Sequence, residues 1–128
     1  YTISGIEKQG FQQGRKLGFP TANLDPSTVV QMIPAYGAYA VTARIEQSLA
    51  MRPAMMNIGT RPTFGGNEVS LETNIFNFSE NIYGKLMLVS FIHRIRGEQK
   101  FDNEEQLQEQ LCMDKKMVEQ QFDKDKEE

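Results

Sequence analysis

Residues 86–95 read LMLVSFIHRI and form the most apolar segment of the chain. Leucine, isoleucine, valine and phenylalanine supply most of this segment, which is the composition of a buried strand. Gly84 marks a turn just before it. The segment therefore predicts a β-strand near the centre of a sheet, and a fold built mainly from strands.

Five further segments read as extended chain, and they cover residues 2–9, 21–24, 38–45, 53–58 and 69–78. Glycine, proline, asparagine and serine are frequent in the connections between them, as is typical of turns. No helical pattern alternates with the strands, as a parallel βαβ fold would require. An antiparallel barrel or sandwich is therefore favoured.

One helix is predicted over residues 103–122, followed by a charged tail at 123–128. Asp102 is the expected N-cap, because Glu105 three residues later completes a pattern like a capping box. Four apolar side chains fall on one stripe of this helix: Leu107, Leu111, Val118 and Phe122. Because a narrow apolar stripe needs a surface to pack against, the helix is expected to dock on the barrel.

The charges are distributed unevenly along the 128 residues, which carry a formal net charge of −3 and suit one domain. Residues 98–128 hold 11 acidic and 5 basic residues, a net charge of −6. Residues 1–97 hold 6 acidic and 9 basic residues, a net charge of +3. This mildly basic body suits a phosphorylated small molecule and is too weakly charged to favour nucleic acid.

Targeting signals are not apparent. No run of about 18 apolar residues is present, and the N-terminus lacks the pattern of a secretory signal. A single cysteine, Cys112, excludes an internal disulfide and is expected to be a packing residue. The cytoplasm is the expected location. The chain opens on strand-like sequence without a starting methionine, which predicts a piece cut from a longer chain.

Residues 14–23, GRKLGFPTAN, are the first candidate for a binding loop. Gly14 and Gly18 let backbone N–H groups turn toward a ligand without obstruction by a Cβ atom. Arg15 and Lys16 can neutralise phosphate charge. The Walker A and G-x-G-x-x-G patterns are both absent. On these residues alone, a plain turn-rich connection remains an equally good interpretation.

The end of this loop offers oxygen ligands for a metal. Pro20 stiffens the chain before Thr21 and Asn23, whose side chains share one face of an extended segment. Magnesium takes oxygen ligands and usually leans on substrate phosphates for the negative charge. The neutral oxygens of Thr21 and Asn23 are therefore adequate ligands if the metal arrives with ATP.

Phosphoryl transfer to a hydroxyl group benefits from a general base, and residues 1–97 contain six acids. Only Glu72 is expected inside an apolar strand, on the face that it would share with Asn74, Phe76 and Phe78. The other five precede the loop, end a strand or lie in or beside turns: Glu7, Asp25, Glu46, Glu68 and Glu80. A strand acid that simply faces solvent is the open alternative for Glu72.

Two further features lie near the start of the helix. Arg94 and Arg96 are expected to share a strand face, where they either bind an anion or face solvent. Phe101 is either a core residue or the cover of a flat aromatic ligand.

Four motifs occur in one order along the chain: GRKLGFPTAN, MNIGTRPTFGG, LETNIFNF followed by IYG, and FIHRIRGEQKFDNEEQL. Together they resemble the riboflavin kinase family, and specifically the C-terminal kinase module of bacterial bifunctional flavin-synthesising enzymes. The resemblance implies a six-stranded antiparallel Greek-key barrel with a C-terminal helix. The expected domain covers residues 1–122, with the barrel at about 2–96.

The resemblance also implies an activity, which is ATP-dependent phosphorylation of the riboflavin 5′-hydroxyl to give FMN and ADP. It assigns Thr21 and Asn23, together with Pro20, to Mg²⁺-ATP, and the segment from Gly14 to Gly18 to closure over the nucleotide. The general base matches Glu72. Two residues match the flavin-binding segment: Arg96 and Phe101.

The partners that the resemblance implies are riboflavin or FMN, ATP or ADP, and an N-terminal FMN adenylyltransferase module in the full-length chain. This fragment alone should make FMN but not FAD, and neither nucleic acid nor membrane is expected as a partner. The sequence departs from the family pattern in the polar segment EKQGFQQGR, and Ala38 stands where valine is usual. A barrel that binds flavin or nucleotide without chemistry is the alternative function.

Overall fold

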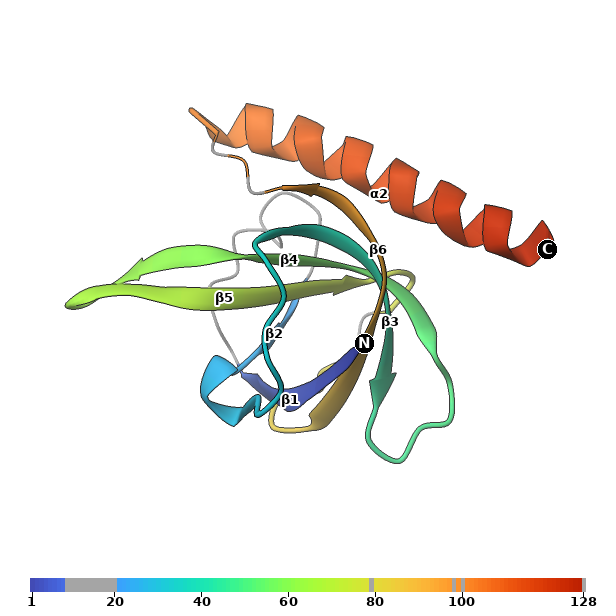
Figure 1. Cartoon of the computed structure of the whole chain (residues 1–128), viewed down its shortest axis with the longest axis horizontal. Helices are drawn as coiled ribbons and strands as arrows, with labels where there is room; N and C mark the ends of the chain where they lie inside the picture. The colour runs from blue at the N-terminus through green and yellow to red at the C-terminus, as the bar shows by residue number, and fades with distance from the viewer. Residues whose placement is uncertain (9–20, 79, 98, 100, 128) are drawn as a thin grey trace.

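The computed structural model shows a closed β-barrel with one long helix lying across its outside (Figure 1). The structure describes residues 1–8, 21–78, 80–97, 99 and 101–127. The six strands are β1 (Thr2–Lys8), β2 (Ala22–Leu24), β3 (Gly37–Ile45), β4 (Arg52–Thr63), β5 (Gly66–Ile75) and β6 (Leu86–Gly97). The helix is α2 (Glu104–Glu127).

The strand order around the barrel is β1-β2-β5-β4-β3-β6, and β6 pairs with β1 to close it. All six neighbouring pairs are antiparallel. The consecutive strands β3, β4 and β5 form a meander, and β6 returns to lie beside β3, which is the Greek-key arrangement. The predicted fold class is therefore confirmed.

The barrel interior is filled by the alternating apolar side chains that the sequence pattern predicts. In residues 86–95, Met87 and Val89 are fully buried, and they belong to the same apolar group inside the barrel as Leu71 and as Ile3, the register partner of Val89. This segment forms most of β6 and pairs with both β1 and β3. Because the barrel is closed, every strand has two neighbours and none is central. We call the apolar group inside the barrel the interior cluster, and its buried members are Ile3, Leu24, Tyr39, Val41, Ala43, Ile45, Ala54, Met56, Ile58, Leu71, Ile75, Ile82, Met87 and Val89. Side chains alternate along a strand, so the neighbours of these residues point outward.

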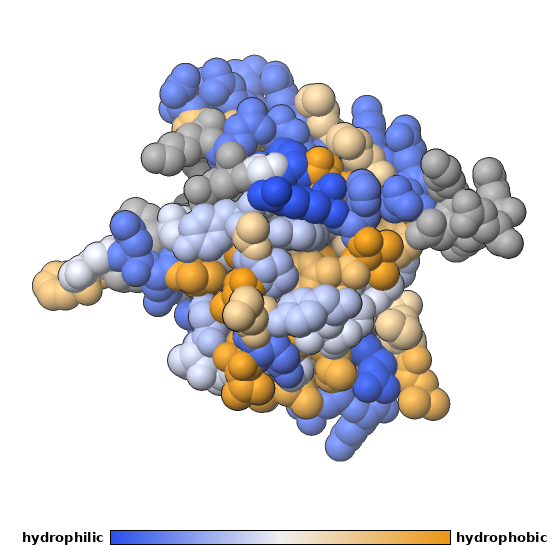
Figure 2. Space-filling view, in the orientation of Figure 1, coloured by the Kyte–Doolittle hydropathy of each residue, from blue (hydrophilic) through white to orange (hydrophobic). Residues whose placement is uncertain are grey.

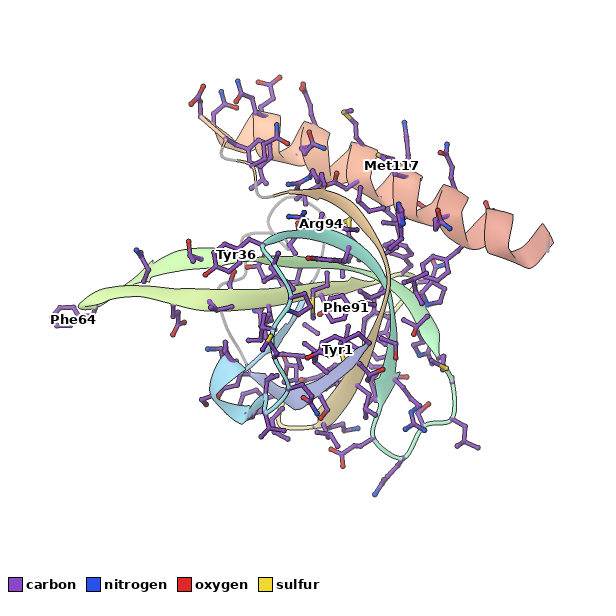
Figure 3. All side chains as sticks on the ribbon, in the orientation of Figure 1. Tyr1, Tyr36, Phe64, Phe91, Arg94 and Met117 are labelled. Carbon is purple, nitrogen blue, oxygen red and sulfur yellow. The ribbon has the colours of Figure 1, made fainter. Side chains whose placement is uncertain are left out.

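Two strands continue beyond the barrel. Residues 59–63 of β4 pair only with residues 66–70 of β5, so this part is a two-stranded hairpin. Phe64 lies at its tip and is fully exposed (Figure 3). The hairpin turn uses Gly65 and Gly66, whose positive φ angles suit glycine.

Helix α2 covers the outer face of the barrel with the stripe that its sequence predicts. Leu111 and Val118 are buried there against Ala40 and Met55, with further partly buried side chains around them from both the helix and the strands. We call this second apolar group the outer cluster. The side of α2 that faces away from the barrel is mostly hydrophilic (Figure 2).

The helix ends differ from the prediction. Asn103, not Asp102, is the N-cap: its Oδ1 accepts the Gln106 amide at 2.9 Å, and Gln106 Oε1 accepts the Asp102 amide at 3.2 Å. The helix therefore begins one residue later than predicted, which is within the usual uncertainty of helix boundaries. The helix also runs to Glu127, through most of the predicted tail. Cys112 is exposed, so the prediction that it packs is wrong.

Within the described ranges, no helix is both long and apolar enough to cross a membrane.

Candidate active site

The short strand β2 sets the geometry of the candidate site. It ends at Leu24, where Asp25 caps a 3₁₀ turn, η1 (Pro26–Thr28). β2 lies between β1 and β5, and there Asn23 is the direct register partner of Glu72. The predicted metal ligand Asn23 and the predicted base Glu72 therefore lie side by side on two adjacent strands.

This pair belongs to a row of residues that crosses all six strands. Residues directly opposite each other in antiparallel strands place their side chains on the same face of the sheet. In strand order, the successive register partners are Lys8, Asn23, Glu72, Asn57, Ala38 and Arg96. We refer to these residues as the outer row.

The outer row points away from the barrel interior. The adjacent partners Leu24, Leu71 and Ile58 belong to the interior cluster, so alternation turns the outer row to the other face. Asn23 is nevertheless only 5% exposed, and Ala38 is fully buried. The row therefore lies on a part of the outer face that is shielded from solvent.

Two side-chain oxygens at the start of β2 fit a metal. Thr21 Oγ1 and Asn23 Oδ1 are both buried, and among the described residues neither has a hydrogen-bond partner. Leaving a buried acceptor unpaired costs on the order of 1–3 kcal/mol, so such atoms usually have a ligand or water. Hydroxyl and amide oxygens suit magnesium when phosphate oxygens supply the charge. The two oxygens thus fit the magnesium of MgATP.

Glu72 stands between two asparagines in the outer row, Asn23 on β2 and Asn57 on β4. Its side chain is half-buried, not fully solvated. Asn74 lies two residues further along on the same face and is 7% exposed. A carboxylate in this setting is held in a polar, partly dehydrated part of the sheet, which suits proton transfer.

The prediction that Phe78 lies on the same strand face as Glu72 is wrong. β5 ends at Ile75, and Asn77 turns the chain with a φ of 56°. Strand alternation stops at that turn, so Phe78 packs against the interior cluster. Phe76 packs against the outer cluster, under α2.

Glu72 was expected to be the one acid of its strand, and this is corrected by Glu68, because β5 begins at Gly66 and not at residue 69. Glu68 lies in β5, where its carboxylate is 3.7 Å from Lys8 Nζ. Glu7 lies in β1 and is only 8% exposed. As the register partner of Leu24, Glu7 points into the barrel interior and away from the outer row. Glu72 is therefore the acid whose side chain shares the outward face of the sheet with the Asn23 side chain.

The interior position of Glu7 affects its ionisation. Burial raises the pKa of the Glu7 carboxyl above its ordinary value of 4.5, and a hydrogen bond with the Asn23 backbone partly opposes this effect. Between the ordinary and the raised pKa, the folded chain therefore binds more protons than the unfolded chain. This carboxyl stabilises the fold most at low pH, and its contribution declines as the pH rises through that window.

Replacing Glu7 with glutamine should remove this decline. Glutamine does not ionise. The melting temperature of the variant minus that of the wild type should therefore increase as the pH rises from about 4 to about 8. Thermal unfolding of both proteins across that range measures the difference. A difference in melting temperature that does not change with pH would contradict the burial effect on Glu7.

Arg94 and Arg96 do not share a face, contrary to the prediction. The register of β3 with β6 shifts just after Ala38, the partner of Arg96, and Arg94 becomes the partner of Tyr39. An extra residue in one strand re-aims the side chains beside it. Arg94 Nη2 accordingly donates to the Tyr36 carbonyl at 2.6 Å (Figure 3). Arg96 instead turns toward α2.

The structure brings the two predicted flavin residues together. Arg96 Cζ lies 5.9 Å from the centre of the Phe101 ring, which is the distance of a cation–π contact. Phe101 is half-buried. The remaining predicted nucleotide-binding residues lie outside the described residues: Gly14, Arg15, Lys16, Gly18 and Pro20.

Two residues of this region were missed by the sequence analysis. Asn57 interrupts the apolar segment of β4 and occupies the outer row next to Glu72. Asp114 is fully buried and bonded to Arg96, at 2.8 Å between Oδ2 and Nη2. Its signal was present in the sequence, because an acid at 114 falls on the same stripe as Leu111 and Val118.

Comparisons with known proteins agree with the motifs. A family model described as riboflavin kinase, Flavokinase, matches residues 1–122. A bifunctional riboflavin kinase/FMN adenylyltransferase of Haemophilus influenzae is 40% identical over 114 residues, which is 89% of this chain and 36% of that protein. The RNA-binding riboflavin kinase RibR of Bacillus subtilis is 38% identical over 122 residues, which is 94% of this chain and 51% of that protein.

A solved structure has the same fold. A crystal structure described as a macrolide-efflux protein from Streptococcus pneumoniae matches with a TM-score of 0.79 and 36% identity, over 92% of this chain and 38% of that one. The chain thus spans between about a third and a half of the length of these relatives, by the coverages of 36% and 51%. The family predicted from the four motifs is confirmed: the chain belongs to the riboflavin kinase family.

Proposed function

We propose that this chain transfers the γ-phosphate of ATP to the 5′-hydroxyl of riboflavin, giving FMN and ADP. Membership of the riboflavin kinase family supports the reaction class. The strongest support from the structure is the outer row, in which Asn23 and Glu72 are direct register partners. A nucleotide held at Asn23 therefore presents its terminal phosphate on the face that carries Glu72.

The nucleotide side of the site is formed by the start of β2. Thr21 Oγ1 and Asn23 Oδ1 are the two unpaired buried oxygens that would hold magnesium. When bound with ATP, Mg²⁺ neutralises phosphate charge that builds up during transfer. We assign Gly14, Gly18 and Pro20 to the loop over the phosphates, and Arg15 and Lys16 to their charge.

Glu72 is the proposed general base. Its carboxylate accepts the proton of the 5′-hydroxyl while that oxygen forms a bond to the γ-phosphorus and the bond to the ADP oxygen breaks. The products are the phosphate ester, ADP and a protonated Glu72. The half-buried position of Glu72 between Asn23 and Asn57 supports this role.

The flavin side of the site is assigned to Arg96 and Phe101. Arg96 ends the outer row, separated along it from Asn23 by its members on β5, β4 and β3, and Phe101 lies beside Arg96. A flavin whose ring system rests near Phe101 would extend its ribityl chain along the row toward Glu72. This order places the acceptor hydroxyl between the ring site and the nucleotide site.

The relatives named above include one whose name includes FMN adenylyltransferase, and one whose name includes RNA binding. For this chain we expect a partner FMN adenylyltransferase module and FMN, not FAD, as its own product. The absence of a nucleic-acid partner and the cytoplasmic location stay predictions.

An assay of ADP release tests the proposal. Release should require riboflavin, ATP and Mg²⁺ together, because the acceptor hydroxyl and the phosphate must occupy the site at once. The alternative, a binding barrel without chemistry, predicts riboflavin binding with no ADP formed. ATP consumption that proceeds equally without riboflavin would overturn the proposal.

A further inference from the structure

Arg96 is held by a residue of the helix. Its Nε donates to both carboxylate oxygens of Asp114 at 3.0 Å, and its Nη2 donates to Oδ2 at 2.8 Å. Gln110 Nε2 donates to Oδ1 of the same carboxylate at 2.8 Å. Asp114 is therefore a fully buried acid whose oxygens are occupied by Arg96 and by one neutral amide.

The position of Asp114 is unusual for an acid. It lies between Leu111 and Val118, two buried apolar residues of the outer cluster, on the face of α2 that packs on the barrel. A buried ion pair there contributes little net stability compared with apolar side chains of similar size, because both charges lose their hydration. Packing alone would therefore favour a leucine at 114, and a different role for the carboxylate is indicated.

The ion pair aims Arg96 along the outer row. Arg96 Nη2 reaches Asn57 Oδ1 at 3.5 Å, and Asn57 is the register partner of Glu72. Between Arg96 and Asn57 stands Ala38, the register partner of both. Its single methyl group leaves room for the long arginine side chain to cross from β6 to β4.

The backbone of Arg96 is fixed as well. At Gly37, a Cβ atom would lie only 2.2 Å from the Arg96 carbonyl oxygen, so β3 and β6 approach each other more closely here than any other residue at 37 would allow. Arg96 Nη1 donates to the Gly97 carbonyl at 3.1 Å. Of the five N–H groups of the guanidinium, contacts within the described part of the chain use four, which leaves one on Nη1.

We propose that Asp114 is a positioning residue for the flavin site, and that helix α2 is thereby part of the site and not only its cover. The carboxylate holds the Arg96 guanidinium in one orientation, beside Phe101 and in line with Asn57 and Glu72. The remaining N–H is then presented to the flavin in a fixed geometry. This inference rests on the proposed function, because it assumes that flavin binds at Arg96.

The test compares Asp114→Asn with Val118→Ala, a control at a fully buried position of the same helix stripe whose side chain has no polar atom to bond Arg96. Asp114→Asn keeps the shape of the side chain but removes its charge, which weakens the hydrogen bonds to the Arg96 guanidinium. Its KM for riboflavin should rise about 10- to 100-fold, the effect of losing a hydrogen bond to a charged group. Its KM for MgATP should stay within about twofold, because β5, β4 and β3 separate Arg96 from Asn23 in the outer row.

Val118→Ala distinguishes positioning from loosening of the helix. It should lower the melting temperature while leaving both KM values within about twofold, because it removes packing and no polar contact. If Asp114→Asn does not fold, Asp114→Glu takes its place, since it keeps the charge and moves the carboxylate by one methylene. An unchanged riboflavin KM in whichever variant folds would overturn the inference, as would equal changes in Asp114→Asn and Val118→Ala.

The wild-type enzyme separates this inference from the proposed function. If the wild type forms no FMN, the proposed function fails. If the wild type forms FMN and the Asp114 variant keeps its riboflavin KM, only the positioning role of Asp114 fails.

Discussion

Replacement of Glu72 by glutamine is expected to lower kcat for FMN formation by about 10²- to 10⁴-fold, the usual contribution of a positioned general base. Glutamine keeps the size and the polar character of the side chain but cannot accept the hydroxyl proton. Riboflavin and MgATP should therefore still bind with affinities within about threefold of the wild type. Steady-state kinetics and a fluorescence titration of riboflavin measure the two quantities separately.

Glu68→Gln is the matched control for this experiment. Glu68 lies four residues earlier on the same strand, so it shares the outward face of β5 and undergoes the same loss of charge. Its carboxylate lies 3.7 Å from Lys8 Nζ, and its register partner on β4 is Arg61, whereas Glu72 is paired with an asparagine there. Its kcat should stay within about twofold of the wild type. A Glu72→Gln variant that turned over as fast as Glu68→Gln would exclude Glu72 as the base.

Thr21→Ala is expected to raise the KM for MgATP by about 10- to 100-fold and to change the riboflavin affinity much less. The substitution removes the buried Oγ1 that has no partner among the described residues and that fits magnesium. Asn23→Ala should act in the same direction, because it removes Oδ1. The measurement is a pair of KM values, one for each substrate, at saturating concentration of the other.

The control for Thr21→Ala is Thr42→Ala. Thr42 Oγ1 is also buried without a described hydrogen-bond partner, but it lies on β3 opposite Pro53 and Ser90, away from the outer row. Both variants lose one buried hydroxyl, so general effects on the fold are matched, and Thr42→Ala should leave the KM for MgATP unchanged. Equal weakening of MgATP and riboflavin in Thr21→Ala would count against its role at the metal.

The fold was largely predictable because it depends on local patterns. The interior of the barrel needs strands with apolar residues on one face, and the strongly apolar segment 86–95 supplies Met87 and Val89 to it. The stripe of α2 was equally visible through Leu111 and Val118. Element ends were less predictable, as Asn103 shows, because Asp102 and Asn103 are both good caps and only the tertiary structure selects one.

The candidate site was predictable in its residue types but not in its pairing. Thr21, Asn23 and Glu72 stood out as the oxygens and the acid that MgATP chemistry needs. That Asn23 faces Glu72, and that Asn57 faces Glu72 from the other side, depends on strand order and register. These contacts join segments far apart in the sequence, which a local pattern does not specify.

Arg96 shows a different limit. Simple alternation placed it on one face with Arg94, and the bulge between β3 and β6 separates them. Its partner Asp114 could be recognised in the sequence as an acid on an apolar stripe, but nothing local connects it with Arg96. A buried charge within such a stripe is therefore a useful indication that a distant partner of opposite charge exists.

The central claim is tested most directly by identifying the product formed from riboflavin, ATP and Mg²⁺, with 5′-deoxyriboflavin as the control acceptor. Separation of the flavins by chromatography, together with a measurement of ADP, shows where the phosphate goes. We predict FMN and ADP in equal amounts from riboflavin, and neither phosphorylated flavin nor ADP above background from the analogue that lacks the 5′-hydroxyl. ADP formed equally with both flavins, or riboflavin recovered unchanged while it is bound, would contradict the assignment.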